Sequence, residues 1–290
     1  MKYHLDQRWH APRLFQRTAA ACGVLLWAAT LCGQDLPADR VTVPLRDPSR
    51  PCRVKANLMS GGITVKGSDG KDVIVEARLR QRRDDNEEEK PNKKSGNLKR
   101  IEIATTALTV EEEDNVVSVS TGTMHRAVDL VIQVPAKTSL KVGCMNDGEI
   151  RVEKVDGEIE ANNLNGGVTL TNVSGVVVAH SLNGEVNVQL ERVTPDKPMS
   201  FSTLNGDIDV TLPADAKATV KMETQNGSIY SDFEIQLDGK PRQPIVEDGR
   251  KGGGKFRVVI EKGRIGSLNG GGPEFQFKTV NGNIHIRKGK

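Results

Sequence analysis

The stretch Leu-Asn-Gly-Gly-Val-Thr-Leu at residues 164–170 returns as Leu-Asn-Gly-Glu-Val-Asn-Val at 182–188 and as Leu-Asn-Gly-Asp-Ile-Asp-Val at 204–210. In each copy, an Asn-Gly pair stands between two runs in which apolar and polar residues alternate. More divergent copies occur on both sides of these three. The chain therefore carries an internal repeat, and one asparagine marks each copy: Asn146, Asn165, Asn183, Asn205, Asn226 and Asn281.

The copies share apolar positions at fixed distances from the asparagine. The sixth residue before it is apolar in every copy: Leu140, Ile159, Val177, Met199, Val220 and Phe275. The fourth residue before it is also apolar: Val142, Ala161, Ala179, Phe201, Met222 and Phe277. The second is small and, apart from one Cys, polar: Cys144, Asn163, Ser181, Thr203, Thr224 and Thr279. Each copy thus rebuilds the same small core, which is typical of a solenoid whose units are stable only when stacked.

The spacing of the copies gives the size of one coil. The first five asparagines follow one another at intervals of 19, 18, 22 and 21 residues, and positions 226 and 281 are 55 apart, which accommodates an ordinary coil plus an inserted loop. Glycines also recur nine residues apart, from Gly148 to Gly184, so that a second, weaker turn divides each coil. We therefore predict an all-β solenoid with coils of about 18–22 residues, each made of two short strands.

The Asn-Gly pair has an expected role at the corner of each coil. Asn and Gly both tolerate positive φ, which a tight corner requires. In a solenoid the asparagines would also stack at about 4.8 Å, the spacing of paired strands, and could hydrogen-bond along the axis. The same pair is a strong signal for a β-hairpin, so an antiparallel β-sandwich or meander is the alternative architecture.

The N-terminal 33 residues have the composition of an export signal. Four basic residues, Lys2 to Arg17, precede an apolar run from Thr18 to Leu31, and polar sequence begins at Gln34. The run of about fourteen residues is shorter than the roughly twenty that a membrane span requires. We expect residues 1–33 to be a signal peptide, and the membrane to be a partner only if this leader is not cleaved.

The remaining sequence, 34–290, is expected to form one elongated solenoid domain. Degenerate coils cover 56–134 and are interrupted by a charged loop at 81–97, which contains no apolar residue. Regular coils cover 135–290, with a glycine-rich insertion at 238–254.

Charge and cysteine content exclude some functions. The leader holds four of the 41 Lys and Arg and one of the 38 Asp and Glu, so the mature chain carries 37 of each and is neutral. Without a basic patch, we expect no nucleic-acid partner. After processing, Cys52 and Cys144 remain, without the spacing of a metal site. A disulfide between them and a pair of small buried thiols are both open.

The Asn-Gly tract from Val134 to the C-terminus resembles a bacterial putative-adhesin family of unknown function, whose exported members carry Asn-Gly-Asp-Ile repeats. The resemblance covers about residues 100–290. It implies a β-solenoid with a role at the cell envelope or surface, and it brings no catalytic residues.

The search for catalytic chemistry finds no nucleophile, phosphate-loop or metal-binding motif, so we expect no catalytic, cofactor-binding or metal-ligating residues. The best acid-base candidates form an outward acidic stripe: Glu149, Glu185, Asp207 and Asp209. We expect a non-enzymatic exported module that acts by contact, adhesin-like or as a scaffold, with a protein or glycan of the envelope or surface as its partner. The alternative is a glycan-active β-helix enzyme, which needs two of these carboxylates about 5–10 Å apart across a cleft.

Overall fold

The computed structural model describes residues 38–80, 106–122, 126–238, 245–248, 256–259 and 263–289. The chain divides into two units, Met1–Asp35 and Leu36–Lys290, and all described residues belong to the second. Every regular element in these ranges is a β-strand, which confirms the all-β prediction. Across the same ranges no helix has the length and apolarity needed to cross a membrane. The expected leader 1–33 and charged loop 81–97 lie outside the described residues, and so does most of the insertion 238–254.

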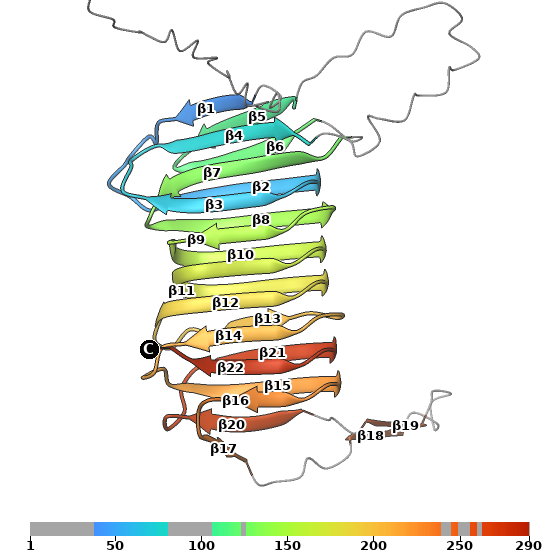
Figure 1. The fold of residues 1–290 in the computed structure, drawn as a ribbon. Coiled ribbons are helices and arrows are strands. Elements are labelled where there is room, and N and C mark those ends of the chain that lie inside the picture. The colour runs from blue at the N-terminus through green and yellow to red at the C-terminus, as the bar shows by residue number, and fades with distance from the viewer. Residues whose placement is uncertain are drawn as a thin grey trace, which may run out of the picture. The chain divides into compact units, whose positions relative to one another are not determined.

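The regular coils stack in parallel and present two faces (Figure 1). The expected division into two short strands does not hold for the coil of β11 (Val168–Asn183), which is one strand of 16 residues that continues from one face onto the other. Ile159 pairs with Val177 on one face, and Ile150 pairs with Val168 on the other, so equivalent positions here are 18 residues apart. Consecutive strands of a sandwich or meander would run antiparallel, and the parallel register therefore contradicts that alternative for these coils. The strands are β8 (Thr138–Asn146), β9 (Ile150–Glu153), β10 (Asp156–Asn165), β11 (Val168–Asn183), β12 (Val186–Val193), β13 (Met199–Ser202) and β14 (Ile208–Leu212).

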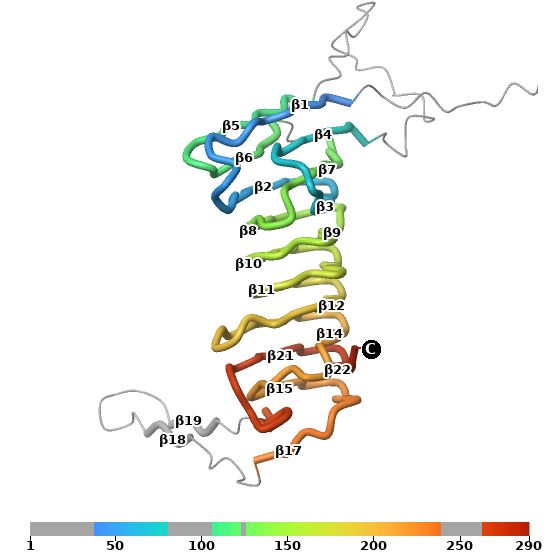
Figure 2. The backbone as a smooth tube through the Cα atoms, turned by 90° about the vertical axis from the view of Figure 1, so that its left-hand side faces the viewer, coloured from blue at the N-terminus to red at the C-terminus, as the bar shows by residue number. Residues whose placement is uncertain are grey.

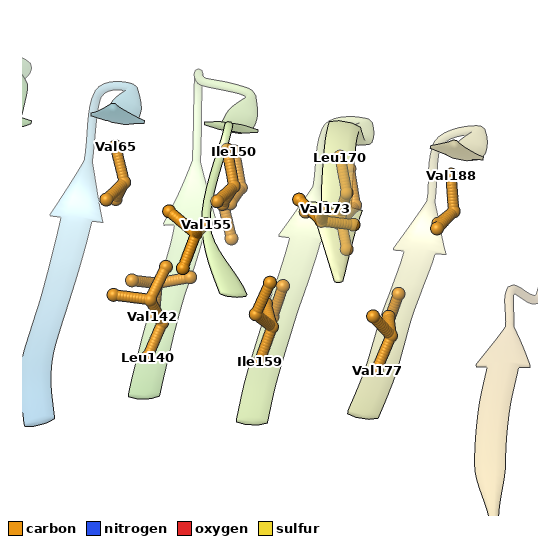
Figure 3. Close-up of a cluster of buried hydrophobic side chains, with 14 of the residues drawn as sticks. Val65, Leu140, Val142, Ile150, Val155, Ile159, Leu170, Val173, Val177 and Val188 are labelled. Carbon is orange, nitrogen blue, oxygen red and sulfur yellow. The ribbon is translucent and has the colours of Figure 1, made fainter. Parts of the chain in front are cut away.

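The core is a narrow column of side chains between the two faces. Figure 3 shows Leu140, Ile159 and Val177 from successive coils opposite residues such as Ile150. All four are at most 2 % exposed. Burying one such aliphatic side chain stabilises the fold by about 1.5–3 kcal/mol relative to its exposure. Period-two alternation along each strand thus supplies both the core and the outer surface.

The C-terminal coil does not stack in chain order. Its strands β21 and β22 lie between the coil of β13–β14 and the coil of β15–β16 (Figure 1), and Figure 2 shows them between β14 and β15. The 55-residue gap does not hold an ordinary coil followed by a loop, because the strands after it do not continue the stack in chain order. The chain instead runs to the end of the stack, forms a cap in which β20 is antiparallel to β15 and β17, and returns one coil inward. These strands are β15 (Ala218–Asn226), β16 (Ile229–Ser231), β17 (Ile235–Leu237), β20 (Arg264–Leu268), β21 (Glu274–Asn281) and β22 (Ile284–Lys288).

Strand β18 (Ile245–Asp248) lies in the insertion 238–254 and pairs antiparallel with β19 (Phe256–Val259), which follows the insertion, as a separate two-stranded sheet.

The N-terminal strands combine one regular coil with an antiparallel cap. Strands β2 and β3 stack in parallel on β8 and β9, so that Ser60 pairs with Asn146. Beyond them β6 and β7 are still parallel to β2 and β3, whereas β5 and β4 are antiparallel to β6 and β7, and β1 is antiparallel to β4. These strands are β1 (Asp39–Val43), β2 (Cys52–Ser60), β3 (Ile63–Ser68), β4 (Val73–Leu79), β5 (Leu108–Glu113), β6 (Val116–Thr121) and β7 (Val128–Pro135).

Candidate functional site

The six repeat asparagines lie in one row at a corner shared by the coils. In each pair, Nδ2 of one asparagine donates to Oδ1 of its neighbour at 2.7–2.9 Å. The side chains are exposed, so each bond contributes about 1 kcal/mol at most. Because the C-terminal coil is inserted, the order along the row is Asn146, Asn165, Asn183, Asn205, Asn281 and Asn226.

The glycine after each asparagine is required by close stacking. A Cβ on Gly166 would lie 2.0 Å from the carbonyl oxygen of Gly148, and one on Gly184 would lie 2.3 Å from that of Gly166. None of the six asparagines has a positive φ, so the expectation that the corner uses this property of Asn is wrong. Strands spaced about 4.8 Å apart bring backbone against backbone at the corner and leave no room for a side chain.

The small residues two positions before the asparagines form a second, inner row. Their side chains donate to the carbonyl of a glycine in a neighbouring coil. For example, Ser181 donates to Gly166 at 2.9 Å, and Thr203 donates to Gly184 at 2.8 Å. Asn163 uses its Nδ2 in the same way, whereas its Oδ1 is buried and accepts no hydrogen bond from the described residues. The inner row therefore satisfies corner carbonyls that would otherwise be buried without a donor.

Cys52 and Cys144 are not bridged. Both thiols are free and buried. Cys144 pairs with Leu58, at the opposite end of β2 from Cys52. Six residues of strand separate these positions by about 20 Å, and a disulfide needs Cα atoms less than about 7 Å apart. The disulfide between Cys52 and Cys144 is therefore contradicted, and the alternative of small buried thiols holds. Cys144 Sγ donates to the carbonyl of Gly61 at 2.8 Å, and burial raises its pKa.

An apolar stripe runs along the outer surface beside the asparagine row. It consists of the residue directly before the corner in six neighbouring coils, a position that points outward. Four members are well exposed: 52 % for Met59, 43 % for Met145, and 38 % for both Leu164 and Leu204. The full apolar stripe, in spatial order, is Met59, Met145, Leu164, Leu182, Leu204 and Val280.

A groove of about 510 Å³ lies along the apolar stripe over four coils. One side is formed by stripe residues from Met59 to Leu182, and the other by the outward residues two positions earlier. Gly143 contributes no side chain to that second side, and the side chain of Asn57 lies over it, because a Cβ on Gly143 would be 2.5 Å from Asn57 Oδ1. No lining residue is Asp, Glu, Lys or Arg: they are Asn57, Leu58, Met59, Gly143, Cys144, Met145, Asn162, Asn163, Leu164, His180 and Leu182.

The fold and this corner can be compared with known proteins. A family model described as Toastrack DUF4097 matches residues 54–266, which is more than half of the chain. The chain belongs to the Toastrack DUF4097 family. Among curated proteins, none matches it significantly.

Solved structures similar to this Toastrack chain are distant in sequence. One is a putative cell adhesion protein from Clostridium sporogenes, with 12 % identity and a TM-score of 0.44, covering 87 % of this chain and 100 % of its own. Another is a putative adhesin from Bacteroides fragilis, with 13 % identity and a TM-score of 0.33, covering 87 % and 97 %. A third is a putative lipid binding protein from Parabacteroides distasonis, with 8 % identity and a TM-score of 0.24, covering 87 % and 97 %.

The acidic stripe of this Toastrack chain is engaged in local pairing. The guanidinium group of Arg287 binds the carboxylate of Asp209 through Nε at 2.8 Å and through Nη2 at 2.7 Å. Asp207 accepts the backbone N–H of Asn283 at 2.7 Å. Glu149 pairs with Arg151, and Glu185 accepts a 3.4 Å contact from Asn187.

Three hollows of the described surface lie away from the acidic stripe. The 510 Å³ groove and two hollows beside Pro213, of about 460 and 720 Å³, are lined by none of the four acidic-stripe residues. No cluster of three His, Cys, Asp or Glu among the described residues could hold a metal ion. None of these three hollows therefore brings carboxylates of the acidic stripe to a cleft.

Sequence reasoning missed the apolar stripe, although its signal is present. Along each strand the residues five, three and one before the asparagine point outward, and such positions are expected to be polar. At the last of them the sequence has Met145, Leu164, Leu182 and Leu204. An apolar residue at the same outward position in successive coils predicts an exposed apolar row.

Proposed function

We propose that this protein is an exported, non-enzymatic module of the cell envelope or surface, and that it works by binding a partner in the groove along the apolar stripe. The observation that carries the proposal is the set of well-exposed side chains from Met59 to Leu204 on a surface whose neighbouring rows are polar. Removing apolar surface from water contributes about 25 cal/mol per Å², so a bound partner would gain most at this place.

Export is supported by the composition of residues 1–33, and a location in the periplasm, at the outer surface or in the medium is consistent with it. We expect the mature chain from the native host to begin near Gln34 and to be found outside the cytoplasm. Mass spectrometry of the N-terminus after cell fractionation measures both. A cytosolic chain would contradict the proposal.

The contact function is tested by the Leu164→Lys variant. An ammonium group placed in the groove would be desolvated by any apolar partner, and we expect retention on native envelope material to fall about tenfold. The matched control is Val178→Lys. Val178 is an outward residue of β11 with almost the same exposure, 39 % against 38 %, but it does not line the groove. Equal retention of both variants and the wild type would rule out the groove.

Glycan cleavage remains the competing activity, and the same purified protein tests it. The double variant Asp207→Asn and Asp209→Asn removes two carboxylates of the acidic stripe. We expect no turnover of envelope polysaccharide by the wild type, and thus no difference in the variant. Turnover that this double variant abolishes would overturn the non-enzymatic proposal.

A further inference from the structure

We infer that the partner of the apolar stripe is a single amphipathic α-helix that lies along the stack, across the strands. This inference rests on the proposed contact function and adds the chemistry of the partner. It is carried by the spacing, width and charge of the stripe.

The spacing of the stripe fits a helix. Its side chains come from neighbouring strands, so they recur about every 4.8 Å along the axis. Apolar residues three and four positions apart on a helix recur at about 5–6 Å, so the two rows of side chains can interdigitate. An extended peptide lying in the same direction places the side chains of one face about 6.6 Å apart and falls out of step within two coils. From Met59 to Val280 the stripe is about 24 Å long, which corresponds to a helix of about 16 residues at 1.5 Å per residue.

The width of the stripe favours one element over a second copy of this chain. The stripe and the groove beside it together span about three residues of strand, or roughly 10 Å, which is the diameter of one helix with its side chains. The corresponding area of about 250 Å² is well below the roughly 800 Å² per partner of a stable protein interface. A second solenoid would need a flat sheet face as wide as the solenoid itself.

The absence of charged residues from the groove lining indicates which residues should flank the apolar face of the helix. Its polar side consists of Asn57, Asn162 and His180, and the asparagine row borders the stripe on the other side. None of these residues is Asp, Glu, Lys or Arg, so they complement uncharged polar residues that flank the apolar face of a helix. Met59 and Met145 adapt to different apolar surfaces.

The test uses the full chain and a labelled peptide of about 18 residues, with Leu and Ala on one helical face and Gln, Ser and Asn elsewhere. A scrambled peptide of the same composition is the control. We expect fluorescence anisotropy to show saturable binding of the amphipathic peptide only, with little change between low and high salt. Leu164→Lys and Met145→Lys should each weaken binding about tenfold, and Val178→Lys should leave it within about twofold. The use of two stripe variants protects the test against misfolding of one.

Three results would overturn the helix as partner. The first is equal binding of the scrambled peptide, or no binding of either. The second is capture of neutral phosphatidylcholine vesicles that Leu164→Lys abolishes, which would assign the stripe to acyl chains. The third is a dimer in light scattering that Leu164→Lys dissociates, which would assign it to a second copy. If the amphipathic peptide does not bind but Leu164→Lys still reduces retention on envelope material, the proposed contact function stands and the helix is rejected as the partner. If the peptide binds but retention is unaffected, the contact function falls.

Discussion

At the scale of single residues, each corner of the stack places a different constraint on each of three nearby residues. The exposed Asn side chain bonds to the next coil, the small residue two positions earlier satisfies a glycine carbonyl, and the glycine itself leaves room for its neighbour's backbone. The asparagines form a row on the outside of the coils, and the small residues form a second row on the inside. Substitutions at adjacent positions of one corner should therefore differ sharply in cost.

Gly166 and Gly167 give a direct test of this difference. A Cβ at Gly166 would lie 2.0 Å from a backbone oxygen, whereas one at Gly167 would have its closest neighbour at 3.4 Å. We expect Gly166→Ala to lower the free energy of unfolding by about 3 kcal/mol or more, since backbone must move. Gly167→Ala should change it by no more than about 0.5 kcal/mol. Urea denaturation of both variants decides the point, and equal losses would contradict close stacking as the reason for the glycine.

The buried thiols give a second residue-scale prediction. Burial raises the pKa of Cys52 from 9.0 to about 11. At pH 8 only about one Cys52 thiol in a thousand is then a thiolate, so alkylation should be far slower than in the unfolded chain. The neutral thiol stabilises the fold fully below pH 9, and this contribution is lost as the pH rises through 11. Iodoacetamide labelling followed by peptide mass spectrometry measures the rate at Cys52 and Cys144. Rapid labelling of the folded protein at pH 8 would contradict their burial.

At the scale of the strand, each rung has a fixed volume to fill. Ala179 of β11 pairs with Phe201 of β13, and Phe201 stacks on Phe277 of β21 with ring centroids 5.2 Å apart. All three are fully buried. Along this column the small Ala161 and Ala179 are neighbours, and the large Phe201 and Phe277 follow them, so the close-packed space at this position differs between these two parts of the stack.

The Ala179→Phe substitution tests this balance. We expect it to overpack the column and to lower the free energy of unfolding by about 1–3 kcal/mol. Val178→Phe is the matched control, because Val178 is the preceding residue and points outward with 39 % exposure. It should be tolerated within about 0.5 kcal/mol. Thermal unfolding followed by circular dichroism compares the two, and an equal effect would show that residue 179 is not in the core.

At the scale of the whole described unit, the C-terminal coil acts as an internal layer of the stack. Its strands contact a coil on both sides, and the Asp209–Arg287 pair and the stack of His285 on Tyr230, with centroids 5.1 Å apart, fix its position. Because β15 and β16 pair with this coil rather than with β13 and β14, the capping strands depend on it.

Truncation after Gly272 should therefore destabilise more than one terminal layer. We expect amide hydrogens of residues 199–231 to lose protection from exchange, since both coils that flank the missing layer lose a partner. Residues 138–165 should stay protected, because each layer of a solenoid contacts only its neighbours. Hydrogen exchange with mass spectrometry resolves these segments. If protection were lost only near the truncation point, the inserted position of the coil would be wrong.

The sequence alone determined the strand period, the stacking of copies and the identity of the inward columns. These depend on local alternation and on repeated spacing, which any stack of equivalent coils must use. Only the tertiary structure decided that the last coil lies between two earlier ones, because coils with the same columns, such as those of Asn205, Asn226 and Asn281, can pair with one another in any order. Tertiary structure likewise separated Cys52 from Cys144 and set Met59 beside Met145, since strand register, and not distance along the chain, determines which side chains meet.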